Sequence, residues 1–125
     1  MTTAREPSVR GNDWRERRHA GWWAFAMHRA SGLALAVFLP LHFLVLGQAL
    51  AGAAALDGVL AWTDRPLVKA SEIALVFLLA AHLAGGLRLL LAEFGGWRAS
   101  WQPALIAVAG GIATVCALVF ALNLA

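Results

Sequence analysis

The fold is decided by an apolar stretch in the second half of the chain, LVKASEIALVFLLAAHLAGGLRLLLA, at residues 67–92. It is longer than the ~20 helical residues needed to cross a hydrocarbon core of about 30 Å. Lipid offers no water to backbone N–H and C=O groups, so a spanning segment must pair these groups within itself. The stretch is therefore predicted to be a transmembrane helix, and Pro66 fits its first turn, where the missing N–H costs nothing.

Two further apolar runs, at residues 23–51 and 103–122, lie on either side of this stretch. Each is also long enough to span a bilayer, and three segments are too few to close a β-barrel. The sequence predicts an all-α integral membrane protein with three transmembrane helices. Its transmembrane domain covers residues 23–125, follows a basic arm at residues 1–22 and contains an Ala- and Gly-rich connection at residues 52–65.

The composition of the 125-residue chain supports this class of protein. Hydrophobic residues make up 61%, charged residues make up 14%, and the mean hydropathy is +0.71. A soluble domain is about half apolar and about a quarter charged, and one of this size has too little interior to hide the excess. The single cysteine, Cys116, excludes an internal disulfide and a CxxC motif.

Basic residues are concentrated on one predicted side of the membrane. Of the ten Lys and Arg residues, all but Arg65 and Lys69 fall in the arm, at the start of the first helix or around the second connection. The positive-inside rule then places the N-terminus in the cytoplasm and the C-terminus on the opposite side. The pI is near 10.5, and the orientation of the chain in the membrane explains these basic residues better than nucleic acid binding does. The expected partner is therefore the lipid bilayer, and no nucleic acid is expected.

Histidines inside the predicted spans are the candidate functional residues, because polar groups in lipid are costly and usually serve a purpose. His82 lies about 16 Å from Glu93 along its helix, near mid-membrane. Gly86, one turn further on, leaves space for a flat macrocycle beside the imidazole, and imidazole is a common axial ligand of haem iron. The spacing leaves haem ligation and a hydrogen bond to a neighbouring helix open as alternatives.

The first span carries the remaining candidates. His42 lies ~20 Å from Arg29 along the helix, which suits one haem shared with His82, a second haem at another depth, or a polar contact between helices. His28 and Arg29 form a cationic pair at the interface, suited to a haem propionate, a quinone oxygen or a lipid phosphate. Simple anchoring by snorkelling is the alternative for this pair. Ser31 follows within a turn, where its hydroxyl can bond back to its own helix.

Two sequence elements resemble the cytochrome b membrane-anchor subunits of succinate dehydrogenase and fumarate reductase (respiratory complex II). HRASG, at residues 28–32, is similar to the His-Arg-x-Ser/Thr-Gly element that opens the first helix of that family. HLAGGLRLLLAEF, at residues 82–94, is similar to its second element, in which a haem-ligating His is followed by Gly, Arg and an acid. His82, Gly86, Arg88 and Glu93 occupy those positions here. Three spans with an inside N-terminus also match.

The resemblance implies that His82 is an axial ligand of haem b and that a second anchor subunit supplies the other ligand. It places Arg29, with Ser31, at a quinone site beside the iron–sulfur subunit. It brings His28 to a haem propionate or to that same quinone site, and Gly86 to the packing around the haem. The flavoprotein and iron–sulfur subunits would dock on the cytoplasmic face of a multi-pass protein in the inner (cytoplasmic) membrane of a bacterium.

The chain also departs from the family pattern. Phe25 stands where the family often has a serine at the quinone site, and Leu89 stands where it often has a second histidine. His42 has no counterpart in members with one haem, but it resembles the first-helix histidine of relatives with two. A two-haem enzyme is therefore the working hypothesis.

The predicted function is that of a haem b-binding membrane anchor of a succinate:quinone oxidoreductase, holding one haem or two. The sequence contains no nucleotide-binding glycine loop for a flavin, so the chain is expected to be a non-catalytic subunit of the oxidoreductase. The alternative is a haem-free structural anchor or assembly subunit, in which the histidines and glycines serve helix packing alone.

Overall fold

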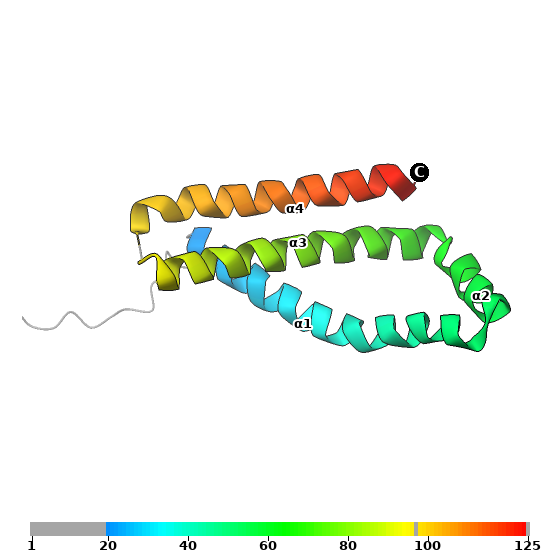
Figure 1. Ribbon diagram of the computed structural model, residues 1–125. Coiled ribbons are helices and arrows are strands. Elements are labelled where there is room, and N and C mark those ends of the chain that lie inside the picture. Colours follow the sequence, from blue (N-terminus) through cyan, green and yellow to red (C-terminus); the bar gives the residue numbers. More distant parts are fainter. Residues whose placement is uncertain (1–19, 97, 125) are drawn as a thin grey trace, which may run out of the picture.

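Three long helices make up most of the structure. The computed structural model describes residues 20–96 and 98–124, which contain α1 (Ala20–Gly47), α3 (Pro66–Phe94) and α4 (Gln102–Leu124) (Figure 1). Three helical segments are long and apolar enough to cross a membrane: Ala20–Ala51, Pro66–Phe94 and Ala99–Leu124. No strand occurs in the described ranges. The predicted fold class, an all-α protein with three transmembrane helices, is confirmed.

Two sequence predictions about the chain ends stay predictions. Residues 1–19 of the basic arm lie outside the described residues. The side of the membrane on which each terminus lies also stays a prediction, as does the division into an arm and a transmembrane domain.

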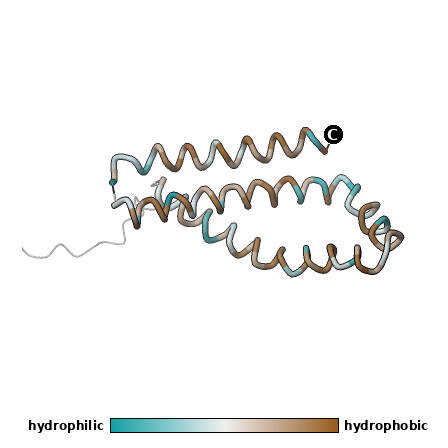
Figure 2. The backbone as a smooth tube through the Cα atoms, in the orientation of Figure 1, coloured by the Kyte–Doolittle hydropathy of each residue, from teal (hydrophilic) through white to brown (hydrophobic). Residues whose placement is uncertain are grey.

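The three long helices are apolar on all sides. Large side chains such as Leu44, Leu83 and Val115 are exposed on α1, α3 and α4 respectively. Figure 2 shows the same hydrophobic character along the length of each helix. A helix that is apolar all round belongs in a membrane or inside a larger assembly, because exposing that apolar surface to water is unfavourable.

The connection between the first two spans is itself largely helical. The short η2 (Gln48–Ala51) extends α1, and α2 (Ala53–Thr63) follows it. The sequence analysis predicted no helix at residues 52–65, but alanine has the highest helix propensity, and three alanines open α2. Gly52 separates η2 from α2 with φ of 113°, a conformation that glycine adopts without the penalty of a Cβ.

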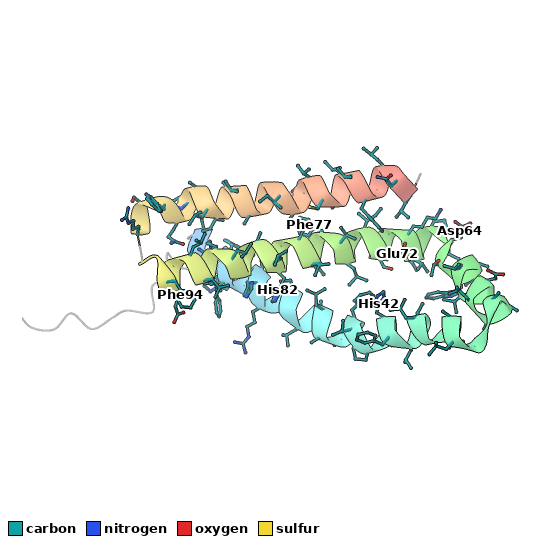
Figure 3. The ribbon with its side chains drawn as sticks, in the orientation of Figure 1. His42, Asp64, Glu72, Phe77, His82 and Phe94 are labelled. Atoms are coloured by element: carbon teal, nitrogen blue, oxygen red, sulfur yellow. The ribbon has the colours of Figure 1, made fainter. Side chains whose placement is uncertain are left out.

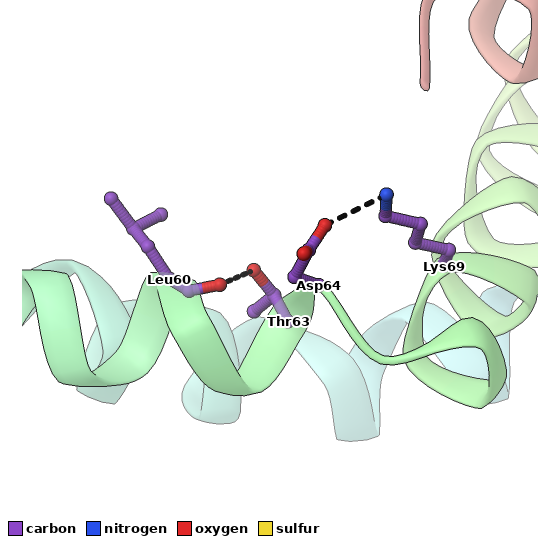
Figure 4. Close-up of polar contacts among 4 residues, drawn as sticks. All are labelled: Leu60, Thr63, Asp64 and Lys69. Carbon is purple, nitrogen blue, oxygen red and sulfur yellow. Dashed lines mark hydrogen bonds and ion pairs between the residues drawn. The ribbon is translucent and has the colours of Figure 1, made fainter. Parts of the chain in front are cut away.

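Polar contacts hold the end of α2 against the start of α3 (Figure 4). Lys69 Nζ lies 2.8 Å from Asp64 Oδ1, and the Thr63 hydroxyl donates to the Leu60 carbonyl at 2.9 Å. Pro66 occupies the first turn of α3, as predicted. The ion pair thus joins the end of α2 to the start of α3.

Helix α3 lies between α1 and α4, and it contacts both. Figure 1 shows α4 running beside α3, whereas α1 crosses α3 near the C-terminal end of α3 and separates from it toward α2. Among the described residues, the only buried side chains are those of Ala113, Ser31 and Arg88. Two of these three are polar, and both lie on α1 or α3 within a few turns of the crossing.

Candidate functional site

Two histidines from different helices stack where α1 crosses α3. The rings of His28 on α1 and His82 on α3 have centroids 4.3 Å apart and planes only 3° from parallel. Both side chains are half-buried. The sequence analysis selected both residues but did not predict that they touch.

One ring nitrogen of His82 is held by α1. Its Nδ1 lies 3.2 Å from the backbone carbonyl oxygen of His28 and 3.3 Å from Ser31 Oγ. The Ser31 hydroxyl itself donates to that same carbonyl at 2.9 Å, and Ser31 is completely buried. A carbonyl oxygen only accepts hydrogen bonds, so this contact requires a proton on Nδ1. A ring that carries its proton on Nδ1 alone presents Nε2 as an unprotonated nitrogen.

Glycines make the close approach of the two helices possible. A Cβ built on Gly32 would lie 3.0 Å from His82 Cε1, and a Cβ built on Gly85 would lie 3.0 Å from His28 Nδ1. Real Cβ atoms are rarely so close to a neighbour, so a side chain at either position forces a ring to move. Small residues at such crossings are typical of packed membrane helices.

Gly86, which is expected to leave space beside His82, also lies next to His28 of the neighbouring helix. A Cβ at Gly86 would meet His28 Cε1 at 3.5 Å, which is an ordinary contact. The tight contact with His82 comes instead from Gly32, one residue after Ser31. The sequence analysis assigned no role to Gly32 or Gly85, although each sits within one of the two quoted elements, and only the helix crossing reveals which ring each glycine faces.

Arg29, in the same HRASG element, does not join this cluster. Arg29 is exposed, and within residues 20–96 and 98–124 it forms no ion pair. The Nδ1 atom of His28 is buried and has no hydrogen-bond partner among the residues that the structure describes. The structure therefore brings together His28, Ser31 and His82, and leaves Arg29 free to meet a ligand or a partner chain.

His42 is not part of this cluster. It is exposed on α1 and packs against Phe38, with ring centroids 5.1 Å apart. Figure 3 shows it farther along α1 than the crossing, in the part of the helix that has separated from α3, whereas His82 lies near the crossing. Over the part of the chain that the structure describes, no three His, Cys, Asp or Glu side chains gather to hold a metal ion.

Comparison with known proteins assigns the chain to a family. Residues 10–120 match the succinate dehydrogenase/fumarate reductase transmembrane subunit family. The chain belongs to this family. The matched range includes both α1 and α3 in full and most of α4, and with them the stacked histidines. The family predicted from the HRASG and HLAGGLRLLLAEF elements is thus confirmed.

Two curated relatives of this transmembrane subunit agree with the family. The succinate dehydrogenase hydrophobic membrane anchor subunit of Halobacterium salinarum is 31% identical over 77 residues, which is 61% of this chain and 59% of that protein. The succinate dehydrogenase 2 membrane subunit SdhC of Mycobacterium tuberculosis is 27% identical over 92 residues, or 74% of this chain and 68% of that protein. The alignment with the first relative thus covers less than two thirds of its length.

Proposed function

We propose that this chain is a haem b-binding membrane-anchor subunit of a succinate:quinone oxidoreductase. The observation that carries the proposal is the hydrogen bond between His82 Nδ1 and the His28 carbonyl. Metal-bound histidines usually donate their second ring N–H to a carbonyl or carboxylate, which fixes the ring and increases the basicity of the ligating nitrogen. Family membership and the two curated relatives support the same reading.

The residues around His82 fit a haem group. The Nε2 atom of His82 would hold the haem iron, while the His28 carbonyl and the Ser31 hydroxyl orient the ring through Nδ1. When bound, haem would supply one-electron redox chemistry. Among the described residues, the stacked His28 is the one other imidazole beside His82, so a further protein ligand of the iron would come from a second anchor subunit.

Arg29 is proposed to contact the quinone. Its guanidinium is exposed and free of carboxylates among the described residues, so it can donate to a quinone oxygen and stabilise negative charge as the quinone is reduced. The predicted quinone contact of Ser31 remains a prediction, and its buried hydroxyl favours a function in orienting His82. The flavoprotein and iron–sulfur subunits, as proposed partners, would dock on the same side of the membrane as Arg29.

The test is the haem content of the assembly purified from membranes. We expect His82→Ala to remove one haem b per assembly and to change the visible absorption spectrum, because the iron loses an axial nitrogen. Ser71→Ala is the matched control, since Ser71 is exposed on the same helix and its hydroxyl bonds only to its own backbone. An unchanged spectrum and haem content in His82→Ala would favour the haem-free structural anchor.

His42→Ala tests the proposed second haem. His42 is exposed and remote from His82, so any haem that it binds would lie between α1 and another chain. Two haems per assembly in the parent and one in His42→Ala, with the His82 haem spectrum retained, is the expected result. The same haem content in both proteins would limit this chain to one haem.

A further inference from the structure

A cavity of about 550 Å³ lies between α1, α3 and α4. This volume is within the range of roughly 300–1,000 Å³ that is typical of small-molecule sites. Apolar and small side chains from all three helices form most of the wall, among them Met27, Phe77 and Gly110. The polar side chains on the wall are those of His28 and Arg88. Arg29 and His82, which carry the proposed quinone and haem contacts, do not line this cavity.

Arg88 has no opposite charge near it in the described part of the chain. Its side chain is only 8% exposed, and its guanidinium donates through Nη1 to Gln102 Oε1 at 2.8 Å. Gln102 is neutral, and Lys69 with Asp64 forms the one ion pair found in residues 20–96 and 98–124. A guanidinium stays charged and has five N–H donors. A single amide oxygen therefore neither balances its charge nor pairs with most of its donors. Such a charge inside a membrane segment marks a binding site.

The position of Arg88 makes the cavity suitable for a molecule with a polar head and an apolar tail. Arg88 lies about 9 Å along the axis from the end of α3 at Phe94, close to one face of the predicted membrane domain. Its partner Gln102 is the first residue of α4, at the same end. The cavity continues from there to Phe77 on α3 and Ala113 on α4, each about 16 Å deeper along its helix.

We propose that this cavity binds an anionic phospholipid, with the phosphate at Arg88 and one acyl chain along the small-residue wall. A neutral carbonyl would satisfy a donor but would leave the charge of Arg88 unbalanced, whereas a phosphate satisfies both. Basic pockets between transmembrane helices on the cytoplasmic side are known to hold anionic lipid headgroups, and the positive-inside pattern predicts that this end of the bundle is cytoplasmic.

Lipid titration of the purified assembly, followed by native mass spectrometry, tests the headgroup. After delipidation in detergent, we expect phosphatidylglycerol to bind about tenfold more tightly than phosphatidylcholine with the same acyl chains. Both lipids carry a phosphate, but the choline ammonium cancels its charge and is repelled by Arg88, whereas the glycerol headgroup leaves the net negative charge that Arg88 requires. Equal binding of the two lipids would overturn the claim that Arg88 selects an anionic headgroup. If inorganic phosphate competed for the site as strongly as the lipid does, the proposed binding of an acyl chain in the cavity would be wrong.

Two pairs of variants test the location. Arg88→Gln is expected to abolish the preference for phosphatidylglycerol, whereas Arg98→Gln, at an exposed arginine outside the cavity, is expected to keep it. Gly110→Leu places a side chain inside the cavity, and Gly111→Leu is its matched control, since both glycines have open space for a Cβ but only Gly110 lines the cavity.

Gly110→Leu and Gly111→Leu test the proposal even if the Arg88→Gln variant fails to assemble. We expect Gly110→Leu to lower the bound phosphatidylglycerol at least tenfold relative to Gly111→Leu, because leucine occupies the volume of the acyl chain. Equal lipid binding by these two variants would place the lipid elsewhere. Unchanged selectivity in an assembled Arg88→Gln variant would point to another counter-ion for Arg88, such as a carboxylate of a partner subunit, and would overturn the proposal.

Discussion

At the scale of single residues, the imidazole of His82 is held by several contacts from the neighbouring helix. One of its nitrogens contacts the His28 carbonyl and the Ser31 hydroxyl, one of its faces stacks on His28, and Gly32 lies against its Cε1 edge. These contacts fix the ring from α1 before any ligand binds. A preorganised imidazole loses little freedom when it coordinates a metal, so the contacts with α1 are expected to affect ligand affinity as well as packing.

The Ser31 hydroxyl is expected to strengthen haem retention. In Ser31→Ala, the His82 ring loses one of the two oxygens near Nδ1, and we expect haem to dissociate about tenfold faster, in the lower part of the range found for outer contacts of metal ligands. The rate is measured by transfer of haem to an excess of apomyoglobin. Ser71→Ala removes an exposed hydroxyl from α3 and should leave the rate unchanged. Equal rates in both variants would assign Ser31 to packing alone.

Gly32 is expected to be essential for the packing of α1 on α3. In Gly32→Ala, the new methyl group would lie 3.0 Å from His82 Cε1, so the ring or the helix must move. Overpacking of this kind typically costs about 1–3 kcal/mol in the free energy of unfolding. Gly47→Ala, at the other end of α1, has nothing within 4 Å of the added Cβ and should be neutral or slightly stabilising. Thermal unfolding in detergent compares the two, and equal midpoints would contradict the close contact.

At the scale of elements, α1 divides into two parts. Residues 28–32 pack against α3, whereas the part of α1 that carries the exposed His42 separates from it (Figure 3), and Pro40 lies inside this helix. Proline in a helix interior lacks the N–H that would bond one turn back, yet membrane helices tolerate this when neighbouring groups compensate. The free part of α1 therefore offers an apolar face and a histidine to a neighbouring chain.

The link between α2 and α3 is expected to depend on pH and salt. The hydrogen bond from the Lys69 ammonium, together with its positive charge, lowers the pKa of the Asp64 carboxyl below its ordinary value of 3.8. Because the pKa of Asp64 is lower in the folded state, the ionised carboxylate stabilises the folded connection between α2 and α3 above pH 3.8. This contribution disappears as the pH falls through the pKa of the folded state.

An NMR titration of Asp64 checks this electrostatic link. We expect the Asp64 pKa to lie below 3.8 in the parent chain and to return toward 3.8 in Lys69→Met. Because Asp64 is exposed and Lys69 is partly exposed, molar salt should reduce the shift by screening. An Asp64 pKa that is the same with and without Lys69 would contradict the ion pair.

At the scale of the whole molecule, the exterior is almost entirely apolar across three helices. Few described side chains are buried, and they lie mainly between α3 and its two neighbours. Hydrophobic exteriors suit lipid on some faces and a partner protein on others, since neither requires polar surface. The separation of α1 from α3 toward α2 gives the molecule an open side, on which a second anchor subunit is proposed to pack.

The charge distribution predicts how this molecule is inserted. We expect a cysteine at Gly58, in α2, to react with a membrane-impermeant thiol reagent added outside the cell. A cysteine at Ser100, in the short helix η3 (Ala99–Trp101) that precedes α4, should react only after the membrane is permeabilised. Both variants require a Cys116→Ala background, because Cys116 is exposed on α4. Labelling of the two positions in the reverse order would contradict the predicted orientation.

The amino-acid sequence by itself determined the fold class of this protein. Long apolar runs in lipid have one way to pair their backbone groups, which is the helix, so length and composition were sufficient to predict three spans. The family was also predictable, because HRASG and HLAGGLRLLLAEF are local strings that need no knowledge of packing. Helix α2 was not predicted, since Ala- and Gly-rich segments have opposing helical preferences that only their context resolves.

The tertiary structure alone decided which of the candidate residues meet. Hydropathy identifies a membrane helix but does not specify how it is rotated or where it crosses its neighbour, because every face of these helices is apolar. The crossing of α1 and α3 brings Ser31 and the His28 carbonyl to His82, turns Gly32 toward His82 and Gly85 and Gly86 toward His28, and leaves His42 outside the cluster. It also leaves Arg88 buried beside a cavity with a neutral partner. These arrangements depend on contacts between distant segments, which spacing along one helix does not contain.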